Sequence, residues 1–529
     1  ALQCPDCHGP TGRMHWRRLG YEHDPLARPV IDHEPIPLLD ADGELVHESG
    51  NPLSMIETCS QCHDIEDEFR ATHAYHSRVA VADLHPERRA LLQQGPHSSD
   101  NDGHEMNCFL CHLDRPNFAE WREAQRSDRP DWAPAATLVG TKVTLKGGEL
   151  LGRGDEGYQW NADALDADEL AVIPMAQPRP EHCGQCHGLV HIDNRPLVME
   201  LGSDQHWNTE ITGEVFSAQR IRQSALNLRN KDGLGRAWDI HAQRLVGCRE
   251  CHYSKMLPEQ LKTAGDADPV AFDSGPRDCA SCHTGGTQHD WLPDQEKHLA
   301  ALACEACHIP QVHLPARQQV DASVIGQDGE YAISYRGLAE GTIDALGTAY
   351  ITGFRPLLIK QADAAGTERW TPVNLISRWY WVDGADGEPV SKEQLRQAWL
   401  EDGRQRPQVI ALFDTDGDGR LQDAELRLDS TAKVELITRL LIDQGIHSPQ
   451  LRARVDVHHL HHNVALKEAQ RDCKRCHESQ EGDVFPVAEY VPGNLLPGDT
   501  GTANLHAALR RDAHGRLVMP RPAAISTSG

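Results

Sequence analysis

The chain has 529 residues and a formal net charge of −27 at pH 7, and 39% of its residues are apolar while only 5% are aromatic. This length exceeds that of a usual single domain, so two or more lobes are expected. The acidic balance disfavours binding to nucleic acid and to anionic membranes. No apolar run approaches the roughly 18 residues of a membrane-spanning helix, so no transmembrane segment is expected.

Eight Cys-x-x-Cys-His motifs account for all 16 cysteines of the chain. In chain order they are Cys4-Cys7-His8, Cys59-Cys62-His63, Cys108-Cys111-His112, Cys183-Cys186-His187, Cys248-Cys251-His252, Cys279-Cys282-His283, Cys304-Cys307-His308 and Cys473-Cys476-His477. This spacing is the attachment signature of c-type haem, in which the thiols form thioethers with the porphyrin and the imidazole ligates the iron. Zinc sites built from Cys-x-x-Cys pairs need no histidine directly after the second cysteine. The sequence therefore predicts eight covalent haem groups, each with its motif histidine as the proximal iron ligand.

The first seven motifs define a seven-haem region, residues 1–309. Because 305 residues carry seven motifs, about 44 residues are present for each haem. Each haem therefore cannot have a fold of its own, and segments of the chain must contact more than one haem. Helices are predicted at 65–93, 218–229 and 288–303, and loop or short hairpins at 131–162, where glycines are frequent.

Residues 310–472 form an insert without attachment motifs, and residues 473–529 carry the eighth haem and a tail. In the insert, helices are predicted at 392–401, 432–444 and 457–471, and strands at 348–359 and 370–382. The predicted fold class is a multihaem cytochrome c, mainly α and loop-rich with little β, in which the haems form a shared core.

Removing the eight motif histidines from the total of 31 leaves 23, enough for a second imidazole on every iron. Two imidazole ligands suit electron transfer, whereas an open or exchangeable position suits catalysis. His241 and His298 stand out because they precede the motif cysteines Cys248 and Cys304 by seven and six residues. The candidate distal ligands are His15, His73, His76, His97, His104, His191, His206, His241, His289, His298, His313, His458, His461 and His462.

No histidine lies between His112 and His182. The other side chains there that commonly bind iron are Lys142, Lys146 and Met175. They are either ordinary loop residues, or a lysine amine ligates one haem.

Residues 414–425 match the loop of an EF-hand calcium site. Asp414, Asp416 and Asp418 occupy positions one, three and five, Gly419 position six, and Glu425 position twelve. Arg420, at position seven, completes the predicted calcium site. The alternative is an acidic surface turn.

The eight motifs, together with residues 215–221 and 238–242, resemble the octahaem tetrathionate reductase family. The resemblance implies a periplasmic enzyme with closely stacked haem pairs, calcium, and one active-site haem that has a lysine as distal ligand. Lys142, Lys146, Lys231 and Lys255 are the candidates for that lysine.

The chain is more distantly similar to the hydroxylamine oxidoreductases, whose catalytic haem is cross-linked to a tyrosine and whose last motif precedes long helices. Only 52 residues follow His477 here. Octahaem nitrite reductases replace one motif histidine by lysine, and no motif does so in this chain.

Three functions are compatible with the motifs. The first is electron conduction through closely packed, mostly bis-histidine haems. The second is an oxidoreductase that acts on a small sulfur or nitrogen compound at one open or lysine-ligated haem, and the third is a subunit of an extracellular cytochrome filament. The expected partners are redox proteins, among them a membrane quinone-linked complex, or further copies of the chain. Because haem is attached in this way outside the cytoplasmic membrane, a periplasmic or extracellular location is expected, with a secretion signal removed before Ala1.

Overall fold

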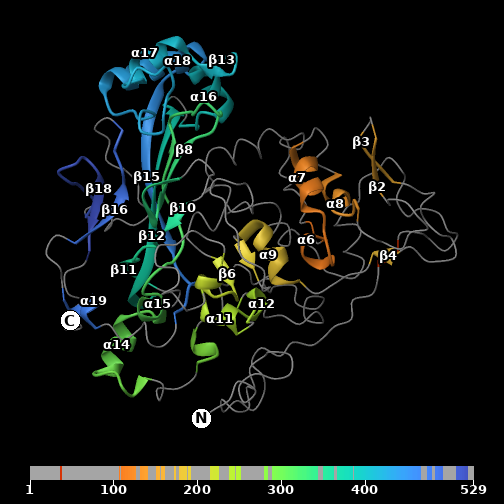
Figure 1. The fold of residues 1–529 in the computed structure, drawn as a ribbon, viewed down its shortest axis with the longest axis vertical. Helices are drawn as coiled ribbons and strands as arrows, with labels where there is room; N and C mark the ends of the chain where they lie inside the picture. The colour runs from red at the N-terminus through yellow and green to blue at the C-terminus, as the bar shows by residue number, and fades with distance from the viewer. Residues whose placement is uncertain are drawn as a thin grey trace. The chain divides into compact units, whose positions relative to one another are not determined.

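The computed structural model describes part of the chain, shown as coloured ribbon in Figure 1. The described residues are 36–37, 107, 109–126, 132–140, 151–154, 157–160, 172–173, 178–187, 189–191, 215–224, 238–244, 246–251, 279–283, 289–343, 349–362, 366–384, 387–465, 473–478, 483–492 and 508–521. The chain divides into two compact units, residues 1–185 with 246–284, and residues 186–245 with 285–529. None of the described helices is both long and apolar enough to cross a bilayer.

The first unit contains short helices and two-stranded ladders. Its described elements are β1 (Ile36–Pro37), which pairs with β4 (Val172–Ile173), α6 (Phe109–His112), α7 (Phe118–Arg126), α8 (Ala133–Ala136), the hairpin of β2 (Leu151–Gly154) and β3 (Gly157–Trp160), α12 (Cys248–Cys251) and the 3-10 turn η7 (Cys279–Ser281). Helix α9 (Pro180–His187) runs across the boundary between the units. The aromatic core of the first unit is formed by Trp132, whose ring lies 6.1 Å from that of Tyr158 and 6.4 Å from that of Trp160.

The second unit is organised around the long strand β12 (Glu368–Asp383). This strand pairs antiparallel with β11 (Leu357–Ala362) and β15 (Pro449–His459), and parallel with β7 (Ala316–Ala322), which pairs in turn with β8 (Ala332–Arg336). One face of the sheet packs Leu375 and Trp379 against Phe485 and Val487. The β-branched and aromatic residues of β12 suit a strand with neighbours on both edges.

Helices α16 (Lys392–Trp399), α17 (Pro407–Phe413) and α18 (Thr431–Asp443) form a helical cap at one end of β12 and β15 (Figure 1). Trp381, near the end of β12, is buried with Trp399 and Phe413 in the core of this cap. Ser391 begins α16 with a capping box, in which its hydroxyl accepts from the Gln394 backbone N–H and the Gln394 side chain accepts from the Ser391 N–H.

The remaining described elements of the second unit are short. They are β5 (Leu189–His191), β6 (Val215–Ser217), η5 (Ile221–Gln223), α11 (Ile240–Gln243), α14 (Gln295–Ala301), α15 (Cys304–His308), β9 (Leu338–Ile343), β10 (Ala349–Ile351), β13 (Leu400–Glu401), β14 (Arg404–Gln405), α19 (Lys474–His477), β16 (Val484–Ala488), β17 (Arg510–Arg511) and β18 (Leu517–Pro520). Helices α14, α15 and α19 lie at the end of β12 opposite the helical cap (Figure 1).

Several predicted elements are confirmed. Helices at 392–401 and 432–444 correspond to α16 and α18, and the strands at 348–359 and 370–382 correspond to β10, β11 and β12. The hairpin expected within 131–162 is β2–β3, although residues 133–136 also form a short helix. The helix predicted at 65–93 lies outside the described residues.

Other expectations need correction. The helix predicted at 457–471 is wrong where it is described, because β15 runs to His459 and Val457 pairs with Leu375 of β12. Where the predicted ranges 218–229 and 288–303 are described, at residues 218–224 and 289–303, the helical parts are the turn η5 and the helix α14. A mainly α fold with little β is not confirmed in the described part of the chain, since the five-stranded sheet organises the second unit.

Asp321 on β7 is a fully buried carboxyl group. Its Oδ1 accepts hydrogen bonds from the backbone N–H of Ser323 at 2.9 Å and from the Ser323 hydroxyl. Its Oδ2 has no hydrogen-bond partner among the described residues. Burial raises the pKa of Asp321 to about 7, although the Ser323 hydrogen bonds and the Arg427 charge oppose this shift.

Asp321→Asn is therefore expected to remove a pH dependence of stability. An acid whose pKa is raised by folding stabilises the fold at low pH, and this contribution is lost as the pH rises from about 4 to about 7. Between pH 5 and pH 8 the wild-type chain should lose roughly 2–3 kcal/mol of unfolding free energy that the variant keeps. Urea unfolding followed by circular dichroism measures this difference. Asp402→Asn, a change at an exposed aspartate, is the control, and equal pH slopes in wild type and Asp321→Asn would contradict the expectation.

Candidate functional site

The Cys-x-x-Cys-His motifs form single helical turns wherever the structure describes them. Six of the eight motifs are described in whole or in part, in α6, α9, α12, η7, α15 and α19. In a helical turn, residues at i, i+3 and i+4 lie on one face, so in α15 and α19 both thiols and the imidazole are directed to the same side. The first two motifs, with Cys4, Cys7, His8, Cys59, Cys62 and His63, lie outside the described residues, as do Cys108 and His252.

The motifs of α15 and α19 lie next to each other in the second unit, although 169 residues separate their first cysteines. Cys307 and Cys476 both pack against the small apolar cluster of Leu302 and Ala306. The backbone N–H of Ala303 donates to the Trp370 carbonyl at 3.0 Å, which fixes the start of α15 to β12. Cys304 and Cys473, the first cysteine of each motif, are exposed. Two groups attached at these motifs would therefore be neighbours.

Each of these two motif histidines faces a second imidazole from the segment just before α15. The ring centroids of His289 and His308 are 6.1 Å apart, and those of His298 and His477 are 5.9 Å apart. Two imidazoles that bind one first-row metal from opposite sides, with metal–nitrogen distances of about 2 Å, have centroids roughly 6 Å apart. Both centroid distances are therefore compatible with an iron between the two rings.

The ring of His298 is oriented by the backbone of its own helix. Its Nδ1 lies 3.1 Å from the Asp294 carbonyl oxygen. Asp294 precedes α14 in a left-handed conformation with φ 46°. Ligating histidines usually hold the second ring nitrogen on a carbonyl or carboxylate in this way, which leaves Nε2 as the nitrogen for a metal.

The segment that supplies His289 and His298 also carries exposed apolar side chains. Trp291 and Leu299 are each 40% exposed, and they belong to the few large apolar residues of the described chain that are exposed to this degree. A porphyrin bound at either histidine pair would bring a large apolar surface against which such side chains can pack.

His241 on α11 is held by the buried carboxylate of Asp239. Its Nδ1 lies 3.4 Å from Asp239 Oδ1, and its backbone N–H donates to the same oxygen at 2.7 Å. Burial would raise the pKa of Asp239, but the contacts with His241 and with the Val464 N–H outweigh it and keep the pKa below its ordinary value. Asp239 is therefore an ionised group next to a predicted iron ligand.

His461 is paired with Glu305, a residue between the two cysteines of the α15 motif. Its Nδ1 lies 3.1 Å from Glu305 Oε1, and its ring stacks on His459 with a centroid distance of 6.0 Å. Burial raises the pKa of Glu305, yet the hydrogen bond from His461 and the nearby His308 bring it below its ordinary value.

The other candidate ligands are placed as follows. His313 and His462 are half-buried in loops, and His458 is half-buried on β15. His191 ends β5, and only its backbone is described. His15, His73, His76, His97, His104 and His206, together with the lysines Lys142, Lys146, Lys231 and Lys255 and with Met175, lie outside the described residues.

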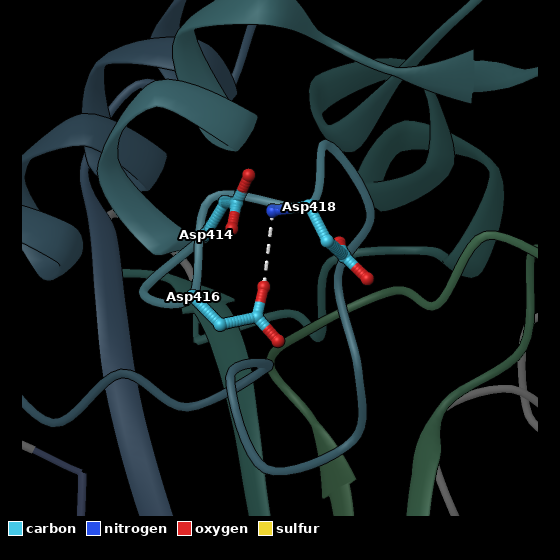
Figure 2. Close-up of side chains that lie close together, drawn as sticks. All are labelled: Asp414, Asp416 and Asp418. Atoms are coloured by element: carbon cyan, nitrogen blue, oxygen red, sulfur yellow. Dashed lines mark hydrogen bonds between the residues drawn. The ribbon is translucent and has the colours of Figure 1, made fainter.

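The predicted calcium loop follows α17 in the helical cap. Asp414, Asp416 and Asp418 each offer a carboxylate oxygen within 4.8 Å of the others (Figure 2). The loop is shaped by its own side chains: Asp414 accepts from the N–H groups of Gly417 and Gly419 at 2.6 and 2.8 Å. Gly419 has a φ of +80°, as the sharp turn at position six requires.

Glu425 stands apart from this cluster of three aspartates. Its Oε1 accepts from the Thr415 N–H at 2.6 Å and from the Thr415 hydroxyl at 2.7 Å, and its Oε2 accepts from the Gln422 N–H at 3.1 Å. The hydrogen bonds from Gln422 and Thr415 lower the pKa of Glu425 to about 2. The carboxylate is thus ionised and joins the two ends of the loop.

Sequence reasoning did not identify Asp239, Glu305 or the Asp294 carbonyl as partners of the histidines. For Asp239 a signal was present, because an aspartate two residues before a histidine can begin a short helix and contact that histidine at the same time. Glu305 and Asp294 have no comparable sequence signal, since their contacts depend on where the segments meet.

Comparisons with known proteins found a distant structural likeness. No protein-family profile and no curated protein matches it. Among solved structures, the chain is similar to an octaheme cytochrome c from Shewanella oneidensis at 14% sequence identity and a TM-score of 0.31, over 80% of this chain and 82% of that chain. A likeness of this size does not assign the chain to the tetrathionate reductase family.

Proposed function

We propose that the chain is a secreted octahaem c-type cytochrome that conducts electrons through closely packed, mostly bis-histidine haems. The observation that carries this proposal is the pairing of His308 with His289 and of His477 with His298, at centroid distances of 6.1 and 5.9 Å. The proposal assigns the first member of each pair as the proximal ligand and the second as the distal ligand. The haem, when bound, supplies a one-electron centre at each motif.

The neighbouring positions of the α15 and α19 motifs support conduction. Their cysteines Cys307 and Cys476 share one apolar cluster, so the two haems would lie close together. Axial ligation by two imidazoles leaves no open position for a substrate on either iron. These two haems would accept and release electrons without binding a small molecule.

The two alternatives make different demands on the remaining haems. An oxidoreductase for a sulfur or nitrogen compound needs at least one iron with an open or lysine-ligated position. A filament subunit needs a contact that carries electrons between copies of the chain. Redox partner proteins, with a quinone-linked membrane complex among them, would serve the conducting and the catalytic forms alike.

His298→Ala should leave one of the eight haem irons without its distal ligand. The thioethers do not involve His298, so mass spectrometry should still find eight haems per chain. Electron paramagnetic resonance of the ferric protein should gain a high-spin signal of about one haem in eight, because that iron loses its distal imidazole. His289→Ala should do the same at a different haem, and the double variant should open two.

His447→Ala is the matched control for these variants. His447 is an exposed histidine whose Nδ1 lies 3.3 Å from Asp383, in the helical-cap half of the sheet, and its removal should leave the resonance spectrum unchanged. An unchanged spectrum in His298→Ala would contradict the assignment. A strong high-spin signal in the wild-type protein would favour the catalytic alternative.

We also propose that the loop after α17 binds Ca²⁺. Asp414, Asp416 and Asp418 would provide carboxylate oxygens, and the Arg420 carbonyl and Glu425 would complete the set. The clustering of three carboxylates on one loop supports this, since such a cluster repels itself unless a cation is bound. The site would stabilise the helical cap, because Phe413, just before the loop, and Leu421, within it, are buried in the core of the cap.

Calcium titration should show one site in this loop. Free calcium at 100 times the dissociation constant should raise the unfolding free energy by about 2.7 kcal/mol, which calorimetry detects as a higher Tm. Asp416→Asn should weaken binding by roughly tenfold or more. Asp423→Asn, a change in the same loop outside the cluster of three, is the control. Equal affinities in the two variants would contradict the site.

A further inference from the structure

Asp239 occupies a junction between three parts of the second unit. The preceding residue, Trp238, is 1% exposed and belongs to the core that contains Ile309 and Val312. Asp239 itself is 2% exposed and begins α11, where its carboxylate accepts the His241 N–H at 2.7 Å. The carboxylate is therefore fixed in place by buried neighbours on one side and by a helix on the other.

Both oxygens of this carboxylate are engaged. Oδ1 lies 3.4 Å from His241 Nδ1, and Oδ2 accepts the Val464 N–H at 3.0 Å. The Ile240 N–H donates back to the Val464 carbonyl at 3.0 Å. Residues 460–465, which we call the bridge segment, are thus joined to the start of α11 through Asp239. His462 of the bridge segment is a further titratable group close to the carboxylate.

The bridge segment also contacts the α15 motif. The Ala465 N–H donates to the carbonyl of His308 at 2.8 Å, and His461 pairs with Glu305. The position of His241 is therefore tied to the same segment that contacts one haem-attachment helix.

We propose that Asp239 is a positioning residue that holds His241 as an axial ligand of one haem iron and lowers the reduction potential of that iron. This inference rests on the proposed function. With Nδ1 on the carboxylate, Nε2 is the ring nitrogen presented to the metal. A carboxylate on the second nitrogen fixes the tautomer and orientation of a ligating imidazole and raises its basicity, which stabilises the more positive ferric state.

His298 gives an internal comparison. Its Nδ1 lies 3.1 Å from a backbone carbonyl, that of Asp294. A neutral carbonyl polarises the imidazole less than an ionised carboxylate does. The haem ligated by His241 should therefore have a lower potential than the haem ligated by His298, which gives electrons a preferred direction between them.

The test uses the full haem-loaded chain and the variant Asp239→Asn. Asparagine is as good a helix-beginning residue as aspartate, so the change removes charge while keeping the acceptor at the start of α11. Spectroelectrochemical titration should show eight haems, one of them with a potential shifted upward. Asp239→Glu, which restores the charge, should return that potential toward the wild-type value.

Asp294→Asn is the matched control. It removes the same charge near His298, where the backbone carbonyl is the acceptor, and asparagine tolerates the left-handed conformation at this position. No haem potential should shift to the extent seen in Asp239→Asn. An Asp239→Asn titration that superimposes on that of the wild type would overturn the inference and leave the proposed function standing, whereas a wild-type chain without covalent haem would overturn the proposed function itself.

His241→Ala keeps the inference testable if Asp239→Asn does not fold. Loss of this ligand should produce a high-spin resonance from one haem in eight at full haem content. A spectrum identical to that of the wild type would show that His241 does not ligate iron, and the inference would fail.

Discussion

The spacing of two imidazole rings, set by where the backbone places them, is the constraint on which the second unit depends. The stretch that runs from His289 through α14 supplies one ring to His308, a short distance ahead in the chain, and another to His477, far away in sequence. An iron between two rings tolerates little error in their separation, because the metal–nitrogen bond length is fixed. The packing of Cys307 and Cys476 on one apolar cluster and the approach of His298 to His477 would meet that requirement at the proposed irons.

β12 connects the two attachment motifs to the helical cap. Trp370 at its beginning contacts the cluster shared by the two attachment motifs, and Trp381 near its end is buried in the helical cap. A strand of 16 residues spans roughly 50 Å, so the calcium loop and the paired histidines lie at opposite ends of one element. Calcium would therefore stabilise the helical cap and β12, and it would not contact the irons proposed at His308 and His477.

The sequence was most informative where spacing alone determines geometry. The motif turns, α16, α18 and β12 follow from local patterns, and the EF-hand spacing anticipated the grouping of Asp414, Asp416 and Asp418. The run of histidines from His458 to His462 was misjudged as part of a helix, because the pairing of Val457 with Leu375 overrides local helical preference. Which histidine faces which motif could not be predicted, since His298 and His477 are brought together by the folding of the insert. The contact of Asp239 with His241 has a local signal in the two-residue spacing, whereas its contact with Val464, 225 residues away, has none.

The two histidine pairs differ in how much chain must be ordered before they form. His289 precedes Cys304 by 15 residues, whereas His298 precedes Cys473 by 175 residues. Closing the longer loop costs about 2 kcal/mol more in chain entropy, and the intervening insert offsets this cost only after its sheet has formed. Under the proposed ligation, the site at His308 would be completed locally, and the site at His477 would be completed only after the insert has folded. The coordination state of the iron proposed at His477 would then report whether the insert has folded.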